Sequence, residues 1–220
     1  MRIMFLCLTA LLFLSAKPKT NAHGGLSDDP DVYDVTFIGD SRTIGMEAAI
    51  QCRDTNFICE AGKGYNWLVS SSVQNRIKKA ENETEYWIFC LGVNDLENAQ
   101  KYIDYLNDFA ENHDGIVCCM SVNPVDDVLA ARCGYPVDNA KIDDFNSKLA
   151  DGLESVYWLD TNWILEDYGF ETVDGLHYKP ETYRMLYDYI YHTFSLEDYY
   201  YRGSIVWSYD PGDKELFWRE

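Results

Sequence analysis

The 220-residue sequence has few basic residues and, after residue 16, no long hydrophobic run. Lys and Arg number 18 against 37 Asp and Glu, which gives a formal charge of −19 at pH 7. A negative field of this size repels nucleic acid and anionic membranes, and it disfavours polyanionic substrates. No later stretch is long and apolar enough to cross a bilayer. The sequence therefore argues against a nucleic-acid partner and against membrane insertion of its main part.

One apolar run does occur, at residues 3–16, directly after the basic start at Arg2. It is short for a membrane span and is typical of the hydrophobic region of a signal peptide. Small residues at the cleavage positions end at Ala22, with Ala16 as a second candidate. We therefore expect a signal peptide over residues 1–22, a flexible lead-in over 23–31 and an exported, soluble protein. Retention as an uncleaved anchor is the alternative.

The chain has seven cysteines, and their spacing does not resemble a zinc site. An even number of six follows the expected cleavage point, and in an oxidising compartment six cysteines permit up to three disulfides. Cys52 and Cys59 would close a short loop, whereas Cys90 and Cys118 lie in apolar runs where buried free thiols are equally ordinary. The sequence leaves the pairing open. The six are Cys52, Cys59, Cys90, Cys118, Cys119 and Cys133.

The rest of the chain alternates short apolar runs with amphipathic segments and shows no internal repeat. This alternation predicts a parallel sheet covered by helices on both faces, in one domain over residues 32–195. A turn signal at residues 210–213 predicts a β-hairpin in a C-terminal extension over 196–220. The expected strands lie in 34–39, 56–62, 85–92, 115–122 and 155–160, and the expected helices in 42–52, 65–80, 96–112, 139–153 and 180–194.

Candidate functional residues follow the ends of the first three expected strands. Ser41 follows the first, Gly62 and Gly64 follow the second, and Asn94 follows the third. Functional groups of a doubly wound sheet gather beyond the carboxyl ends of its strands, near the switch in strand order. In an order of 2-1-3, Ser41 lies between the glycine turn and Asn94. A serine between a backbone amide and a side-chain amide is placed to attack a carbonyl.

A nucleophilic serine needs a base, and His177 is the histidine best placed to supply it. It follows the fifth strand, three residues after Asp174, whose carboxylate can accept a hydrogen bond from the imidazole. Of the others, His23 is in the lead-in, His113 is expected at a turn on the opposite edge of the sheet, and His192 is expected within the last helix.

The four blocks "GDS" at 39–41, "GKG" at 62–64, "GVND" at 92–95 and "DGLH" at 174–177 together resemble the SGNH/GDSL hydrolases. This resemblance implies a flavodoxin-like α/β/α sandwich with a parallel five-stranded sheet of order 2-1-3-4-5, and hydrolysis of esters without metal or organic cofactor. It also assigns roles. Ser41 would be the nucleophile, His177 the base and Asp174 the residue that orients it, while Ser41, Gly64 and Asn94 would form the oxyanion hole. Asp40 and Asp95 would be supports. Arg42 stands where the family usually has an apolar residue.

Each signal alone also has an ordinary structural explanation. Ser41 is a favoured helix N-cap residue, and Gly62 and Gly64 are common turn residues. Asn94 can cap a helix, and His177 can be a surface loop residue. Their occurrence together, in order and each after the required strand, favours a nucleophile at Ser41.

The substrate follows less directly from the sequence. Six Trp and 17 Tyr could offer stacking surfaces for sugars, although core packing also explains aromatic residues. We expect removal of acetyl or other short acyl groups from a carbohydrate or another small ester. The alternatives are a lipase- or thioesterase-type hydrolase of longer acyl esters, acyl transfer to a sugar, and a catalytically silent glycan-binding module. The sequence does not give the oligomeric state.

Overall fold

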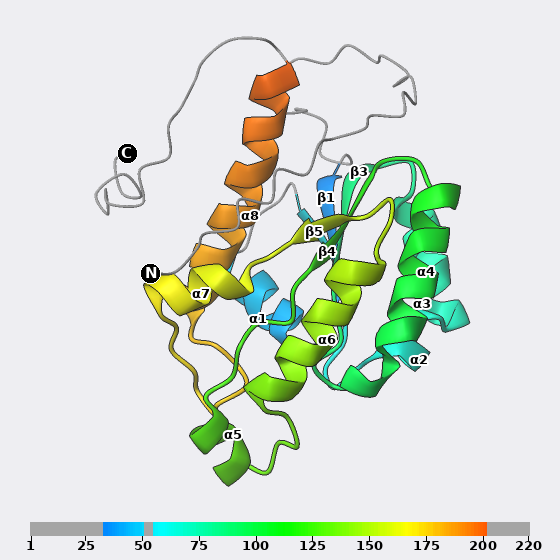
Figure 1. The fold of residues 1–220 in the computed structure, drawn as a ribbon. Helices are drawn as coiled ribbons and strands as arrows, with labels where there is room; N and C mark the ends of the chain where they lie inside the picture. Colours follow the sequence, from blue (N-terminus) through cyan, green and yellow to red (C-terminus); the bar gives the residue numbers. More distant parts are fainter. Residues whose placement is uncertain (1–32, 51–54, 202–220) are drawn as a thin grey trace, which may run out of the picture.

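The computed structural model describes residues 33–50 and 55–201, with side chains described over 35–50 and 55–191 and at Thr193. Five strands form a single parallel sheet of order β2-β1-β3-β4-β5 with helices packed on both faces, which confirms the predicted three-layer architecture (Figure 1). The elements in chain order are β1 (Tyr33–Gly39), α1 (Ser41–Ile50), β2 (Thr55–Cys59), α2 (Tyr65–Leu68), α3 (Ser71–Ala80), β3 (Thr84–Cys90), η1 (Leu96–Asn98), α4 (Ala99–Asn112), β4 (Ile116–Met120), α5 (Asp127–Arg132), α6 (Asn139–Gly152), β5 (Tyr157–Leu159), α7 (Asn162–Tyr168) and α8 (Pro180–Tyr201).

Alternate residues of the central strands enter two separate cores, because successive side chains of a strand point to opposite faces. In β1, Phe37 packs on the face covered by α1 and α8, whereas Ile38 packs on the face covered by α3, α4 and α6. Trp87 of β3 is fully buried in the second core. Burying such a side chain stabilises the fold by roughly 1.5–3 kcal/mol, so this layer is firmly held.

The switch in strand order falls at β1, which pairs with β2 on one side and with β3 on the other. The three strands end level, since Gly39 pairs with Cys59 on one side and with Cys90 on the other. The segments that follow these strands therefore start side by side at one edge of the sheet. This is the edge at which the sequence predicts the active site.

Several helices differ from the expected boundaries. The expected helix at 65–80 is two helices, α2 and α3, because the Ser70 side chain accepts a hydrogen bond from the Val73 backbone N–H and starts α3 anew. The loop expected between β4 and α6 contains α5, and α7 follows β5. Helix α8 continues to Tyr201, beyond the boundary expected at residue 195.

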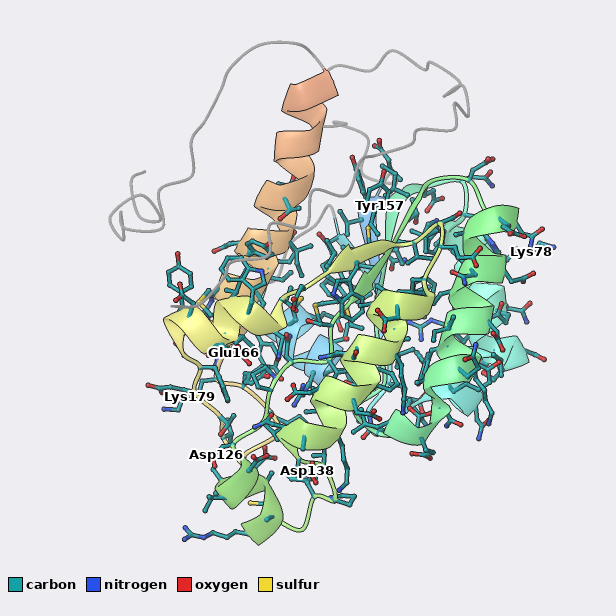
Figure 2. All side chains as sticks on the ribbon, viewed as in Figure 1. Lys78, Asp126, Asp138, Tyr157, Glu166 and Lys179 are labelled. Carbon is teal, nitrogen blue, oxygen red and sulfur yellow. The ribbon has the colours of Figure 1, made fainter. Side chains whose placement is uncertain are left out.

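The expected signal peptide, the lead-in and the hairpin turn at 210–213 lie outside the described residues, so those three predictions stand as they were. Within the described part of the chain, no helix is long and apolar enough to cross a membrane. Charged side chains such as those of Lys78, Glu166 and Lys179 are exposed and extend from the outside of the ribbon (Figure 2).

The described cysteines carry free thiols. Cys90, Cys118 and Cys119 are buried in the sheet, in agreement with the apolar runs around them. Cys59 donates a hydrogen bond to Glu47, and Cys133 is exposed. Cys52, its proposed partner, lies outside the described residues. Burial raises the pKa of the Cys119 thiol to about 12, so this thiol is neutral and behaves as a small apolar side chain.

Candidate active site

Ser41 is the first residue of α1, immediately after β1. Its neighbour Asp40 provides the cap, because the Asp40 carboxylate accepts the Arg42 backbone N–H at 2.9 Å and its carbonyl accepts the Ile44 N–H at 3.1 Å. The explanation of Ser41 as an ordinary N-cap is therefore wrong. The hydroxyl of Ser41 instead lies 2.8 Å from His177 Nε2.

His177 joins Ser41 to Asp174 through its two ring nitrogens. Nδ1 lies 2.7 Å from Asp174 Oδ2, while Nε2 faces the serine hydroxyl. In the neutral imidazole, Nδ1–H donates to the carboxylate and Nε2 accepts from the serine O–H. The side chains of His177 and Asp174 are 30% and 27% exposed, so this chain of hydrogen bonds opens to solvent on one side.

Asp174 accepts four hydrogen bonds. Its Oδ1 accepts the backbone N–H groups of Leu176 and His177 at 3.0 and 2.8 Å, and its Oδ2 accepts from the His177 ring and from the Tyr135 hydroxyl, both at 2.7 Å. Partial burial alone would raise the pKa of this carboxyl, but these hydrogen bonds outweigh it and hold the pKa well below its usual range. Asp174 is therefore ionised at neutral pH.

Gly175 allows the segment from Asp174 to His177 to turn. Its φ of +89° lies in the left-handed region, and a Cβ there would stand 2.1 Å from the Ala130 nitrogen of α5. The Asp126 N–H also donates to the Gly175 carbonyl at 2.9 Å. The Asp–His segment is thus docked on α5, an element that the sequence interpretation missed.

Asn94 follows β3, and its side chain bonds to the segments that follow β1 and β2. Its side-chain Nδ2 donates to Asp40 Oδ2 at 3.1 Å and to the Lys63 carbonyl at 2.9 Å. Asp40 precedes Ser41 and Lys63 precedes Gly64, so these two bonds bring Asn94 close to both expected backbone donors. An oxyanion that bound here would share or replace one of the present acceptors of the amide.

The loop that carries Gly64 is held by Asp95. This carboxylate accepts the Tyr65 N–H at 2.7 Å, the Tyr102 hydroxyl at 2.7 Å and the Asn98 side chain at 3.0 Å. A Cβ on Gly64 would stand 2.4 Å from the same carboxylate, so only glycine fits. Asp95 therefore has the supporting role that the resemblance implies.

Asp40 is 1% exposed. Burial raises the pKa of its carboxyl to about 6, against the opposing effects of the Arg42 backbone N–H and guanidinium. The carboxylate is therefore ionised above neutrality and can accept from both Arg42 and Asn94.

Arg42, which departs from the family pattern, is a buried cross-link between α1 and two loops. Its guanidinium donates to the carbonyls of Leu176 at 3.1 Å, Asn123 at 2.7 Å and Pro124 at 3.5 Å, and it lies over the Tyr178 ring. It is 8% exposed. Because Leu176 precedes His177, this contact ties the histidine segment to the residue that follows Ser41. No pattern in the sequence predicts this role.

The histidines not chosen lie elsewhere. His113 follows α4 at the opposite edge of the sheet, where its ring stacks on Phe109 at a centroid distance of 3.7 Å. The His192 side chain and His23 lie outside the described residues. No group of three or more acidic, histidine or cysteine side chains within the described residues could hold a metal ion.

Known proteins resemble this chain in fold but not in sequence. No model of a known protein family matches the sequence, and no curated relative matches it. Among solved structures, a Streptococcus pneumoniae protein described as a platelet activating factor is 18% identical, with a TM-score of 0.55, over 76% of this chain and 84% of that one. The C-terminal catalytic domain of S. pneumoniae peptidoglycan O-acetyltransferase A, solved with a methylsulfonyl adduct, is 14% identical, with a TM-score of 0.50, over 74% and 92%.

A member of the lipolytic G-D-S-L family from Veillonella parvula is 17% identical, with a TM-score of 0.42, over 70% of this chain and 94% of that one. At such identities the likeness to the two streptococcal structures shows the fold alone. The observed parallel sheet of order 2-1-3-4-5 between helices is the fold that the sequence resemblance to the SGNH/GDSL hydrolases implies.

Proposed function

We propose that this chain is a secreted serine ester hydrolase that removes acetyl or other short acyl groups from a carbohydrate, with Ser41 as nucleophile. The observation that carries the proposal is the chain of hydrogen bonds from Ser41 through His177 to Asp174, at 2.8 and 2.7 Å. A serine hydroxyl, an imidazole and a carboxylate, hydrogen-bonded in this order, are the parts of an acyl-transfer site.

In the first half of the reaction, Ser41 Oγ attacks the ester carbonyl while His177 Nε2 takes the serine proton. The carbonyl electrons move to oxygen, and the Ser41 and Gly64 N–H groups with the Asn94 amide stabilise this charge. The tetrahedral intermediate then expels the alcohol, which takes the proton from His177. The acyl group remains on Ser41.

In the second half, water attacks the acyl-enzyme and gives a proton to His177, and the second intermediate releases the carboxylic acid. The serine recovers its proton from Nε2. Asp174 stays ionised throughout, because its hydrogen bonds hold its pKa well below its usual range. It orients the ring and stabilises the imidazolium without taking up a proton.

Two observations favour a short acyl group. The cavity lined by Asp40, Arg42 and Met46 has about 20 Å³, which is space for roughly one water, and none of Ser41, Asp174 and His177 lines it. The much larger groove of about 800 Å³ lies between α7 and α8, and none of Ser41, Asp174 and His177 lines it. A lipase- or thioesterase-type activity, the alternative, would need a wide apolar pocket at the serine.

Carbohydrate as the acyl carrier is supported by charge and by aromatic side chains near the site. The net charge of −19 disfavours polyanions. Tyr65 and Trp67 are only partly buried and follow Gly64 directly, on α2. The domain of similar fold is named a peptidoglycan O-acetyltransferase, which keeps acyl transfer to a sugar as a second candidate.

The test compares nitrophenyl esters of two to twelve carbons with acetate release from acetylated neutral glycans. We expect turnover to be highest for acetyl and to fall with chain length. Ser41→Ala should abolish turnover with the fold intact, because Asp40 provides the cap of α1. A matched control is Ser71→Ala, at the start of α3 and exposed, which should keep full activity.

Retained turnover in Ser41→Ala would remove the nucleophile from the proposal. A preference for long chains would favour the lipase-type alternative. Absence of turnover on every ester, with glycan binding retained, would favour the silent binding module. Acyl transfer would appear as acetylated sugar in place of free acetate.

A further inference from the structure

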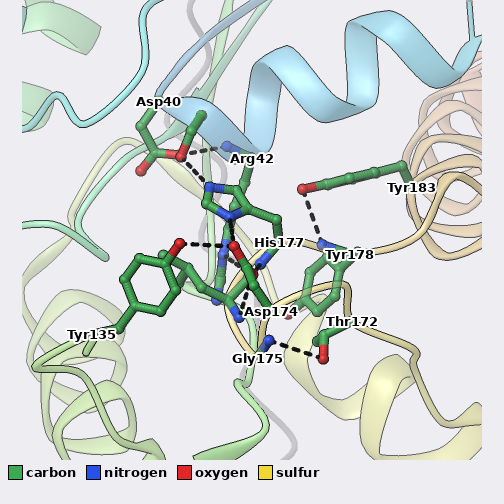
Figure 3. Close-up of polar contacts among 11 residues, drawn as sticks. Asp40, Arg42, Tyr135, Thr172, Asp174, Gly175, His177, Tyr178 and Tyr183 are labelled. Atoms are coloured by element: carbon green, nitrogen blue, oxygen red, sulfur yellow. Dashed lines mark hydrogen bonds and ion pairs between the residues drawn. The ribbon is translucent and has the colours of Figure 1, made fainter. Parts of the chain in front are cut away.

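Tyr135 shares an acceptor with the proposed catalytic base. Its hydroxyl donates to Asp174 Oδ2 at 2.7 Å, and the same oxygen accepts from His177 Nδ1 at 2.7 Å. Figure 3 shows the tyrosine and the imidazole converging on this carboxylate from different sides. The two rings also meet edge to face, with centroids 6.0 Å apart and an interplanar angle of 74°. Tyr135 lies outside the four sequence blocks and is marked by no motif.

The local fold holds the hydroxyl in this place. Tyr135 follows α5 through Gly134, which has a φ of +84°, and its backbone N–H donates to the Ala130 carbonyl at 3.0 Å. Its ring packs against the core formed with α4 and α6. Gly175 packs on the backbone of the same helix α5. The tyrosine and the Asp–His segment therefore share one support, which fixes their separation.

An ordinary explanation is that a half-buried tyrosine simply finds a nearby acceptor for its hydroxyl. The acceptor, however, is Asp174 Oδ2, so this hydrogen bond also acts on the base. A donor on Oδ2 disperses part of the carboxylate charge that would otherwise stabilise the imidazolium. It also limits rotation of the carboxylate, which orients the ring. Correspondingly, the hydrogen bond to Asp174 raises the pKa of the Tyr135 hydroxyl, so the phenol remains a donor.

We propose that Tyr135 is a positioning residue for the base: it holds Asp174 in line with His177 and lowers the tendency of the imidazole to stay protonated. This inference rests on the proposed esterase function. Without the hydroxyl, the full carboxylate charge faces the ring and the imidazolium is more stable. The base would then be neutral, and the enzyme active, only at higher pH.

The experiment measures kcat/KM for nitrophenyl acetate from pH 5 to 9 with the wild-type chain, Tyr135→Phe and Tyr105→Phe. Tyr105 is a matched control, because it is also partly buried against the same core and its hydroxyl accepts from Gln74, away from Asp174. For Tyr135→Phe we expect the acid limb of the profile to move to higher pH by about half a unit, because the imidazole feels only part of the carboxylate charge that the lost donor had dispersed. Tyr105→Phe should follow the wild type.

The plateau value of kcat should also fall a few-fold in Tyr135→Phe, with KM for this small ester nearly unchanged, because the ring is less well oriented. A Tyr135→Phe profile that coincides with the wild type would overturn the inference, and so would an equal shift in Tyr105→Phe. An inactive wild type is a separate result, since it would contradict the esterase proposal itself. Phe preserves the ring packing, and circular dichroism of both variants checks the fold.

Discussion

The side-chain amide of Asn94 donates a hydrogen bond to the carboxylate of Asp40 across a distance of 3.1 Å, and so connects the segments that follow β3 and β1. The Asp40 carboxylate is almost completely buried, and burial raises its pKa to about 6. Its ionised form is therefore held at the site at a cost in folding free energy, and it places the amide that is proposed to bind the oxyanion.

This relationship predicts a pH-dependent stability difference for Asp40→Asn. The pKa of Asp40 in the folded chain, about 6, is above the value of about 3.9 for an unfolded aspartate. The contribution of Asp40 to the free energy of unfolding is therefore fully present below pH 4 and is lost as the pH rises through 6. The variant does not undergo this loss. Its free energy of unfolding, relative to wild type, should therefore rise by about 3 kcal/mol between pH 4 and pH 7.

Urea unfolding at pH 4, 5, 6 and 7 measures this difference. Asp151→Asn, at an exposed position on α6, is the control and should show a constant offset from wild type. A constant offset for Asp40→Asn as well would contradict the raised pKa of Asp40.

Asn94→Ala should lower kcat for a short acyl ester by about 10²–10³-fold, the usual loss for one oxyanion donor. Steady-state kinetics on a nitrophenyl ester is the measurement. Asn112→Ala should leave the rate unchanged, because that amide bonds only to Asp108 on its own helix α4. A loss smaller than about tenfold for Asn94→Ala would place the oxyanion elsewhere.

Activity should rise with pH as His177 becomes neutral, since only the neutral ring can accept the serine proton. His177→Ala should remove most activity at every pH. His113→Ala should keep the wild-type pH profile, because that ring lies at the far edge of the sheet against Phe109. The pH dependence of kcat/KM tests both variants, and an essential His113 with a dispensable His177 would show that the base is misplaced.

Arg42→Met should lower both stability and turnover. Methionine retains much of the buried volume but leaves the carbonyls of Leu176 and Asn123 without their donor, which is expected to cost about 2–4 kcal/mol. With the histidine segment less firmly tied to α1, kcat should fall more than KM changes. Thermal melts and ester kinetics measure the two effects.

Arg76→Met is the matched control, because the exposed Arg76 side chain donates only to the Phe57 carbonyl. It should change stability by less than about 1 kcal/mol. An Arg42→Met protein that keeps wild-type stability and turnover would show that the guanidinium is dispensable.

The sequence determined the elements and the residues that mark their ends. Apolar runs and helical periodicity give the strands and most helices, because these patterns are local and repeat along the chain. The positions of Ser41, Gly64, Asn94 and His177 directly after strands follow from the same patterns, since parallel strands end at one edge. The sequence also indicated Asp174 as the partner of His177, three residues away.

The tertiary structure alone decided the contacts that hold these residues in place. Arg42 lies 134 positions from Leu176, and Tyr135 lies 39 positions from Asp174. No periodic pattern records such distances, because they depend on how the loops dock on one another. The short helix α5, on which Gly175 packs, gave no signal for the same reason. The cap of α1 also went to Asp40 and not to Ser41, because the serine hydroxyl is directed to a histidine brought in from the far end of the fold.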